Sequence, residues 1–534
     1  MFFQLLSFFL FTGMVAFFAW YQIRKSDTSS KDGYFLGGRS LSGIVIAGSL
    51  LLTNISTEHL IGMNGSAYEN GAIIIAWEVT SAIALVIAAI YFVPRYLKMG
   101  ITTIPEFLEN RFDQQMRMLI AFLLIISFVC TILPIVLYTG AINVESIFNL
   151  SETLGITQKQ SLWLTVMVIG AIGSVYAIFG GLKTIALTDT INGFGLIILG
   201  LLIPAIALAD IGEGKMIEGL VRVFENSPQK FNVISLEPSI GPGSRMAILP
   251  FAVLFTGLII NQLYFWTMHQ SIIQRALGAA SLKEAQKGLL FTGALKILVP
   301  LIVVLPGIIA YYYFGDSMLN QQDSVYPELV KKVLPEWMTG LFIAVIIGAI
   351  FSTFNSVLNS AATVFSFDIY DKIRKDRNQS DIVRTGKKCS VILAIGSMII
   401  APFVANAPSG LYQLLQQLNG IFFIPMATVI LAGFVFKSVS AAGAKAGLFF
   451  GLAFYVILNY VIKVEMHFVH IWGLEFVLNL IVMHLVSLYY KPKKSFSIRD
   501  VGVVEVEPWR FTKPMSVILI VVTVLIYILL GNVG

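Results

Sequence analysis

The chain of 534 residues is unusually rich in apolar side chains: 57% of its residues are hydrophobic and only 12% are charged. Ordinary soluble domains contain about 45–50% apolar and about 25% charged residues. The net charge of +6 is shared among short segments between apolar blocks, which suits membrane topology better than a nucleic-acid-binding surface. The composition therefore predicts a multi-pass membrane protein that has the lipid bilayer as a partner and binds no nucleic acid.

The apolar residues fall into about fourteen blocks, most of them about 20 residues or longer, which is the length that crosses a bilayer core. In chain order the blocks are 3–22, 41–66, 72–93, 118–148, 161–180, 187–209, 246–268, 289–314, 337–365, 388–404, 411–433, 441–462, 468–489 and 514–531. The first block lacks a preceding positive charge and is followed by Arg24 and Lys25, unlike a cleaved signal peptide. We therefore predict an all-α polytopic membrane protein with about 14 transmembrane helices.

Basic residues are concentrated in alternate loops. If the amino terminus lies outside, the cytoplasmic segments are the basic ones, at 24–39, 95–111, 183, 275–287, 372–388, 437 and 491–513. The remaining loops, at 149–160, 210–245, 315–336 and 402–410, are acidic, mixed or uncharged. The excess of Lys and Arg on the cytoplasmic side of membrane proteins then predicts a cell (inner) membrane protein with both termini extracellular or periplasmic.

Two apolar blocks are interrupted by polar residues near their middles. The block at 41–66 contains TNISTEH at 53–59, and the block at 246–268 contains NQ at 261–262 followed by YFW at 264–266. Polar groups at bilayer depth are costly unless they face a cavity or a partner. The interruptions lie five blocks apart, as two inverted five-helix repeats with a binding site near the midplane would require. Polar residues that hold packed helices together would give the same pattern, so both interpretations stay open here.

The block at 337–365 carries a stripe of small and hydroxyl-bearing residues at three- and four-residue steps, which places them on one face of a helix. The stripe consists of Ala349, Ser352, Thr353, Ser356, Asn359, Ser360 and Thr363. Small residues of this kind also let helices approach closely, which is the simpler explanation. The hydroxyls of Ser352 and Thr353, together with carbonyls freed by the interruption at 53–59, are suited to binding a sodium ion.

Few ionisable residues lie inside the apolar blocks, and each is a functional hypothesis by default. They are Glu58, His59, Glu78, Asp189 and Lys296. Glu78 shares a helical face with Ser81, and a carboxylate beside a hydroxyl suits the hydroxyl groups of a sugar. Lys296 needs a nearby carboxylate or substrate oxygens, and a purely structural Glu–Lys pair is the alternative. His59 is compatible with a proton relay and with a neutral hydrogen-bond donor.

Ordered motifs along nearly the whole chain carry a resemblance to a known family. They are GYFLGGR at 33–39, NISTEHLIG at 54–62, IPEFL at 104–108, RF at 111–112, GGL at 180–182, TD at 188–189, QRAL at 274–277, EAQKG at 284–288, LNSAAT at 358–363 and DIY at 368–370. With these motifs the sequence resembles the sodium/solute symporter family, and within it the sugar branch of sodium/glucose and bacterial sodium/galactose cotransporters. STFN at 352–355 and APSGLY at 407–412 resemble a branch of bacterial symporters with poorly defined substrates.

The resemblance implies a LeuT-type core of two inverted five-helix repeats. The expected organisation is a leading transmembrane helix and cytoplasmic loop at 1–40, repeat 1 at 41–209, an extracellular loop at 210–245, repeat 2 at 246–433 and three peripheral transmembrane helices at 434–534. In this arrangement the two interrupted blocks take matching places in the two repeats.

The resemblance also implies binding residues. The expected sodium ligands are the carbonyls of Leu52, Ile55 and Ala349 and the hydroxyls of Ser352 and Thr353, with Asp189 on the exit route of the ion. The expected sugar ligands are His59, Glu78, Ser81, Gln262, Lys296 and Gln416, with Trp266 beneath the sugar. Phe265 stands at the inner gate, where the bacterial galactose carrier has a tyrosine, and Gln262 stands where that carrier has an asparagine.

We therefore expect a secondary active transporter that couples inward sodium flow to uptake of a galactose- or glucose-like sugar by alternating access. It is expected not to be an enzyme and to use no cofactor besides sodium as the coupling ion. The sequence contains no Walker A motif for ATP-driven transport. A sodium-coupled symporter of another polar solute, such as an organic acid, a polyol or an amino acid, is the main alternative. A sodium and solute sensor or channel without coupling is the more distant one.

Overall fold

The computed structural model describes residues 2–25, 28–246, 248–319, 322–374, 378–406, 411–492 and 496–531. Over these residues the regular elements are helices, and β-structure is limited to three isolated bridges. Ten helical segments are long and apolar enough to cross a membrane, and the count rises to eleven if Leu282–Leu298 and Pro300–Phe314, which meet at 41°, form one span. The all-α membrane fold is confirmed, whereas the predicted number of 14 helices is not.

The helices of the first half are α1 (Phe2–Lys25), α2 (Lys31–Leu36), α3 (Gly43–Asn54), α4 (Asn64–Asn70), α5 (Ala76–Val79), α6 (Ser81–Ile87), α7 (Val93–Met99), α8 (Ile104–Arg111), α9 (Gln114–Ser127), α10 (Leu133–Phe148), α11 (Leu150–Leu154), α12 (Gln158–Ile211) and α13 (Met216–Asn226). Those of the second half are α14 (Gly257–Thr267), α15 (Gln270–Leu277), α16 (Leu282–Leu298), α17 (Pro300–Val303), α18 (Leu305–Phe314), α19 (Gln322–Val333), α20 (Glu336–Val364), α21 (Asp371–Ile373), α22 (Gln379–Ile400), α23 (Leu411–Val435), α24 (Ala441–Val456), α25 (Phe468–Tyr489) and α26 (Thr512–Leu530). Wider π-helical turns occur at Glu58–Met63, Ala88–Phe92, Phe128–Ile132, Phe365–Tyr370 and Ile457–Ile462. Tighter 3₁₀ turns occur at Gly37–Arg39, Gly71–Ile75, Pro228–Phe231, Ser244–Met246, Phe251–Phe255 and Ala401–Asn406.

Breaks and kinks explain why apolar blocks and helices do not correspond one to one. The block at 41–66 is divided, because α3 ends at Asn54 and Ile55 is extended, with φ −85° and ψ 98°. The blocks at 161–180 and 187–209 both lie in α12, which consists of two helical parts that meet at Gly181, where φ +63° and ψ −179° are not helical. Gly181 has a φ of +63°, and a Cβ atom there would lie 2.7 Å from the carbonyl oxygen of Tyr34. Only glycine tolerates both conditions, so this residue fixes where α12 changes direction.

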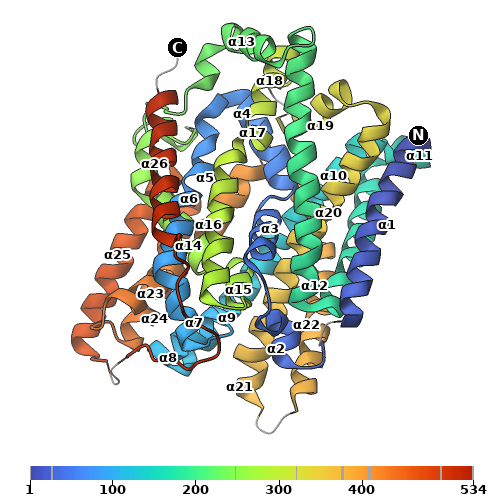
Figure 1. Ribbon diagram of the computed structural model, residues 1–534. Coiled ribbons are helices and arrows are strands. Elements are labelled where there is room, and N and C mark those ends of the chain that lie inside the picture. The colour runs from blue at the N-terminus through green and yellow to red at the C-terminus, as the bar shows by residue number, and fades with distance from the viewer. Residues whose placement is uncertain are drawn as a thin grey trace.

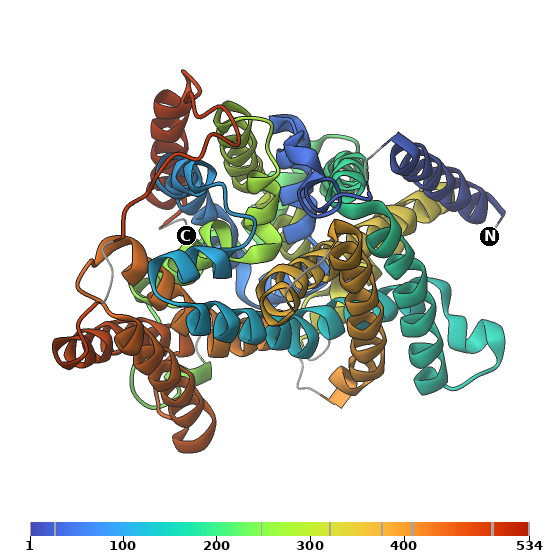
Figure 2. The ribbon, with the colours of Figure 1, turned by 90° about the horizontal axis from the view of Figure 1, so that it is seen from below.

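The helices form a bundle in which α3, α14, α15, α16 and α20 lie inside and α1, α24, α25 and α26 lie outside (Figures 1 and 2). In the view of Figure 2, α1 lies at the edge opposite to α24 and α25. The outer helices turn large apolar side chains outward, among them Phe9, Phe17, Leu485 and Leu529. An apolar outer surface of this kind is the one that a bilayer covers.

The connecting segments sort to two ends of the bundle. Helices α2, α8 and α21 lie at the lower end of Figure 1. There Lys31 on α2 lies 4.0 Å from Asp371, and Lys372 lies 2.9 Å from Glu109. At the other end, the loop at 210–245 meets the last helix, because the Val233 amide donates to the Leu530 carbonyl over 3.0 Å. The contacts of Lys31 and Lys372 bring together three of the predicted basic segments, those at 24–39, 95–111 and 372–388. The predicted motif and loop residues at 375–377, 407–410 and 493–495 lie outside the described residues.

Helix α1 begins, and helix α26 ends, at the upper end of the bundle in Figure 1. The side of the membrane on which the termini lie stays a prediction. The segments predicted as loops at 210–245 and 315–336 contain the helices α13 and α19 at that same end. These two segments are therefore more ordered than a connecting loop would be.

Candidate functional site

A cavity lies between the first break and helices α14, α16, α20 and α23. Its wall consists of Thr53, Asn54, Glu58, His59, Trp77, Glu78, Ile132, Asn261, Gln262, Phe265, Trp266, His269, Ser271, Ile272, Lys296, Thr353, Val357, Tyr412, Leu415, Gln416, Asn419 and Phe423. Six of the seven predicted substrate ligands, and the predicted gate Phe265, are among these residues. The structure therefore brings most of the predicted substrate ligands together in one cavity.

The first break, after α3, contributes Asn54, Glu58 and His59 to the wall of this cavity. Beyond the extended Ile55, the amides of His59 and Leu60 both point to the Ser56 carbonyl, over 3.1 and 3.2 Å. The chain resumes there as the π-helical turn Glu58–Met63 rather than as a regular α-helix. Non-helical backbone at bilayer depth is tolerated where it is buried in protein or lines a cavity. The predicted interruption of this block is therefore confirmed.

The charged centre of the cavity is an ion pair between Lys296 on α16 and Glu78 on α5. Lys296 also donates to the Asn54 side-chain oxygen over 2.5 Å. His59 lies between two carboxylates, with Nδ1 3.4 Å from Glu58 and Nε2 3.8 Å from Glu78. The predicted Glu–Lys contact is thus present in the cavity wall, where it can serve both helix packing and a ligand. Two buried carboxylates and a single lysine line the cavity, which leaves this region rich in hydrogen-bond acceptors.

The second break does not lie where the sequence predicts it. Helix α14 runs unbroken from Gly257 to Thr267, through the polar and aromatic residues expected to interrupt it. The helix survives because the Gln262 amide is satisfied by other groups: its Nε2 donates to the Trp77 carbonyl over 2.7 Å, and its Oε1 accepts from Trp266 Nε1 over 3.1 Å. The break falls instead at Met268 and His269, between α14 and α15, where both amides converge on one carbonyl, that of Tyr264.

Aromatic rings close the cavity on two sides. The Tyr412 ring lies 5.3 Å from the His59 ring and 5.9 Å from the Trp77 ring. On the other side, Phe265 stacks on His269 with ring centroids 5.5 Å apart and an angle of 20° between the planes. Gln416 lines the cavity one helical turn from Tyr412 on α23. Phe265 thus lies at the boundary of the cavity, as a gate residue should, although its gating role stays a prediction.

Two residues depart from the sequence-based site. Ser81 is buried but does not line the cavity, because its hydroxyl donates to the carbonyl of Glu78 in the preceding turn. His269 was not foreseen, yet it is fully buried in the cavity wall, and its Nε2 has no hydrogen-bond partner among the described residues. The available signal was a histidine three residues after the aromatic run at 264–266, at the end of an interrupted apolar block.

The predicted sodium ligands lie where α3 ends against α20. The Thr353 hydroxyl donates to the carbonyls of Thr53 and Leu52, over 3.0 and 3.4 Å. The buried Ser352 hydroxyl lies beside the Asp189 carboxylate but makes no hydrogen bond of normal geometry among the described residues. Ile55 and Ala349 are fully buried in the same region. Carbonyl and hydroxyl oxygens beside an unwound helix are the donor set that a sodium ion requires, and the Ser352 oxygen fits that ligand.

Asp189 does not line the large cavity but lies near Ser352, outside it. The two residues share the wall of a smaller cavity with Asn192 and Asn355, next to α1. The Asp189 carboxylate accepts a hydrogen bond from Ser49 over 2.7 Å and lies 3.9 Å from the Arg275 guanidinium. This position is compatible with the predicted role of Asp189 on an ion route, which stays a prediction.

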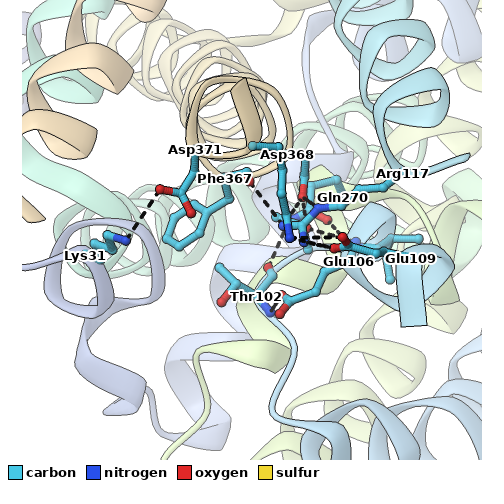
Figure 3. Close-up of polar contacts among 12 residues, drawn as sticks. Lys31, Thr102, Glu106, Glu109, Arg117, Gln270, Phe367, Asp368 and Asp371 are labelled. Carbon is cyan, nitrogen blue, oxygen red and sulfur yellow. Dashed lines mark hydrogen bonds and ion pairs between the residues drawn. The ribbon is translucent and has the colours of Figure 1, made fainter. Parts of the chain in front are cut away.

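A second polar network joins α8, α9 and α15 to the segment that follows α20 (Figure 3). Arg117 on α9 lies 2.6 Å from Asp368, at the end of the helix that carries Ser352, and 2.5 Å from Glu109. Gln270 at the start of α15 accepts from the Ile104 amide over 2.9 Å and donates to the Thr102 carbonyl over 3.3 Å. Burial raises the pKa of the Glu109 carboxyl, but hydrogen bonds from Lys372 and Arg117 outweigh it and leave that pKa below its ordinary value.

Curated proteins similar to this chain are transporters. An uncharacterised symporter, YidK of Escherichia coli (strain K12), is 43% identical over 533 residues, which cover 99% of this chain and 91% of the relative. A sodium/glucose cotransporter of Vibrio parahaemolyticus is 34% identical, covering 82% of this chain and 81% of the relative. A sodium/myo-inositol cotransporter of Homo sapiens is 28% identical, covering 84% of this chain and 65% of the relative.

Solved structures agree with the fold. A Na⁺-coupled sialic acid symporter in a substrate-bound, outward-open state matches with a TM-score of 0.77 at 20% identity, over 92% of this chain and 99% of the other. A nucleobase-cation-symport-1 family transporter in a closed conformation matches with a TM-score of 0.52 at 16% identity, over 87% and 94% of the two chains. The model of the sodium:solute symporter family matches residues 34–451. The chain therefore belongs to the sodium:solute symporter family.

Proposed function

We propose that this protein couples the inward flow of sodium to the uptake of a sugar, or a closely similar polyhydroxylated solute, by alternating access. The observation that carries the proposal is the cavity beside the first break, in which the Glu78–Lys296 pair and the amides of Gln262 and Gln416 face one space. Charged and amide groups of this kind exchange several directional hydrogen bonds with sugar hydroxyls. Aromatic walls such as Trp266 suit the apolar face of a sugar ring.

The coupling ion is proposed to bind at the end of α3, to the carbonyls of Leu52, Ile55 and Ala349 and the hydroxyls of Ser352 and Thr353. The two sites share the same broken helix, because Asn54 contacts Lys296 while Leu52 contacts Thr353. Occupation of one site therefore changes the backbone that forms the other, which is the physical basis of coupling. Moving one charge inward across about 100 mV supplies roughly 2.3 kcal/mol, or about fiftyfold accumulation.

The finer architecture belongs to the same proposal. We place the two inverted repeats at 41–209 and 246–433, within about 14 crossings, and the three peripheral helices at 434–534. The end at which the basic segments gather is proposed to be cytoplasmic, with both termini on the periplasmic side of the inner membrane. The network of Arg117, Asp368 and Gln270 would then lie on the route by which solute leaves the cavity.

The charges of the cavity narrow the choice of solute. Lys296 is engaged by Glu78, and Glu58 adds a second carboxylate with an oxygen that has no partner among the described residues. An anionic solute would meet carboxyl groups and a lysine that already has a partner, which disfavours organic acids. A cyclic polyol is the second candidate, because a relative named as a sodium/myo-inositol cotransporter aligns with most of this chain.

The test is uptake of labelled galactose, glucose and myo-inositol into proteoliposomes. An inward sodium gradient should drive accumulation above equilibrium, and an equal potassium gradient should not. Accumulation of one solute would establish coupled transport and name its class. Sodium binding without accumulation of any of the three would keep the coupling ion and reject the sugar assignment.

A further inference from the structure

Arg275 is a fully buried arginine that joins four segments of the bundle. It lies on α15, where it donates to the Ser271 carbonyl of its own helix. Its Nε donates to the Ser49 hydroxyl on α3 over 3.2 Å, and another nitrogen donates to the Ser356 hydroxyl on α20. Its guanidinium also lies 3.9 Å from the Asp189 carboxylate on α12. A buried arginine is stable only when opposite charge and acceptors surround it, and Asp189 supplies that charge.

Asp189 is approached from two sides. On one side, Ser49 bridges it to Arg275, because the Ser49 hydroxyl donates to the carboxylate over 2.7 Å and accepts from the guanidinium. On the other side lies the small cavity that Asp189 shares with Ser352. An ion that leaves the proposed sodium ligands through this cavity meets a carboxylate that already has a cation behind it. Sodium and the guanidinium therefore compete for one negative charge.

Helix α15 links the contact between Arg275 and Asp189 to the polar network at residues 102–104. Every residue of the helix, Gln270–Leu277, is buried. Gln270 holds the segment at 102–104 through two hydrogen bonds (Figure 3). One turn later, Gln274 donates to the Phe35 carbonyl and the Thr363 hydroxyl and accepts from Ser360. Arg275 follows directly on the same eight-residue helix, so a displacement of its guanidinium acts on both glutamine contacts.

We propose that Arg275 is the internal counter-cation of Asp189 in the sodium-free protein and that this pair holds α15 closed. Sodium passing Asp189 weakens the hold of the carboxylate on Arg275 and loosens α15, which favours opening of the lower end. Once sodium has left, Arg275 neutralises Asp189 again and closes that end for the return step. The inference rests on the proposed sodium coupling and is independent of the identity of the solute.

The first test measures binding of ²²Na⁺ to the purified full-length protein. Arg275→Gln removes the competing cation, so the half-saturating sodium concentration should fall by about fivefold or more. Arg275→Lys keeps the charge and should stay within about twofold of the native value. In an Asp189→Asn background, Arg275→Gln should change the half-saturating sodium concentration less than about twofold, because residue 189 then carries no carboxylate for which sodium and Arg275 could compete. A purely structural role would lower thermal stability in Arg275→Gln without lowering the half-saturating concentration.

The second test measures hydrogen exchange of peptides that cover residues 268–278, with and without sodium. Sodium should increase exchange in the native protein, whereas Arg275→Gln should exchange faster already without sodium and respond little to it. If Arg275→Gln does not fold, the Asp189→Asn, Arg275→Gln double variant avoids an unpaired buried charge and is compared with Asp189→Asn. Native ²²Na⁺ binding with an unchanged affinity in Arg275→Gln, or exchange indifferent to sodium in the native protein, would overturn this inference alone. Absence of ²²Na⁺ binding by the native protein would overturn the proposed sodium coupling as well.

Discussion

Lys296 on α16 and Glu78 on α5 form an ion pair inside the cavity, with side chains that are only 1% and 2% exposed. Removing one partner leaves the other charged and buried, which typically costs about 3–5 kcal/mol. Removing both leaves no unpaired charge. The pair therefore allows the contribution to packing to be separated from the contribution to ligand binding.

We predict that Lys296→Ala and Glu78→Ala each lower the melting temperature of the purified protein and abolish solute uptake. The double variant should regain much of the melting temperature but none of the uptake, because the ligand contacts are still missing. The measurements are thermal melting and uptake of whichever of galactose, glucose or myo-inositol the native protein accumulates. Normal uptake in the double variant would contradict the assignment of this pair to the substrate.

A matched control is the pair of Lys287 and Glu284 on the same helix α16, 2.7 Å apart and 27% and 24% exposed. A pair of this exposure contributes on the order of 0–1 kcal/mol. Lys287→Ala should therefore change the melting temperature little and leave uptake close to native.

Ser352→Ala is predicted to raise the half-saturating sodium concentration by about tenfold, because a hydrogen-bond-type contact to a charge contributes about 1.5 kcal/mol or more. The loss should appear in ²²Na⁺ binding and not in thermal stability, since the Ser352 hydroxyl makes no normal hydrogen bond among the described residues. Ser397→Ala on α22 is the control, because that hydroxyl donates to the Leu393 carbonyl of its own helix. An unchanged sodium affinity in Ser352→Ala would remove this residue from the ion site.

The sequence predicts best those structural features that involve residues with a high free-energy cost at bilayer depth. The first break, at Ile55, and the meeting of Glu78 with Lys296 could both be predicted, because charged and polar groups at bilayer depth need partners. The gathering of the basic segments at one end follows from charge as well. Each of these features follows from one large contribution to the free energy, either the cost of a polar group without a partner in the membrane or the preference of basic loops for one side.

The rest depends on which partner each polar group finds. Gln262 was expected to interrupt α14, but its amide is satisfied by Trp77 and Trp266, so the backbone stays helical. Ser81 was expected in the cavity, but its hydroxyl finds the Glu78 carbonyl one turn earlier. Serine commonly bonds back to its own helix in this way, and no spacing rule reveals when it does. His269 was not predicted as a site residue, because its place in the cavity wall follows from the break at residues 268–269, which the sequence analysis expected at 261–266.

Gly181→Ala is predicted to lower the melting temperature strongly. The residue has a φ of +63°, and the added Cβ atom would lie 2.7 Å from the Tyr34 carbonyl oxygen. Gly155 has a φ of +65° but nothing within 4 Å of an added Cβ atom, so Gly155→Ala measures the cost of the backbone conformation alone, about 1–2 kcal/mol. Equal melting temperatures for the two variants would show that the contact between α12 and α2 relaxes without cost.

Acid should destabilise the lower end of the bundle through Glu109. The pKa of its carboxyl is below the ordinary value of 4.5, because the hydrogen bonds from Lys372 and Arg117 outweigh the effect of burial. A carboxyl whose pKa is lower in the folded state binds fewer protons folded than unfolded, so its stabilising contribution is complete above about pH 5 to 6. That contribution is lost as the pH falls through the lowered pKa.

Melting temperatures of the native protein and Glu109→Gln, recorded between pH 7 and pH 3, test this account. The variant should melt lower at pH 7, and the gap should narrow below about pH 5, because protonation removes the same charge from the native protein. Glu328→Gln is the control, since Glu328 pairs with Lys331 at i,i+3 on α19, where the two side chains are 42% and 35% exposed. A gap that stays constant down to pH 3 would mean that Glu109 stabilises the network by packing and not by its charge.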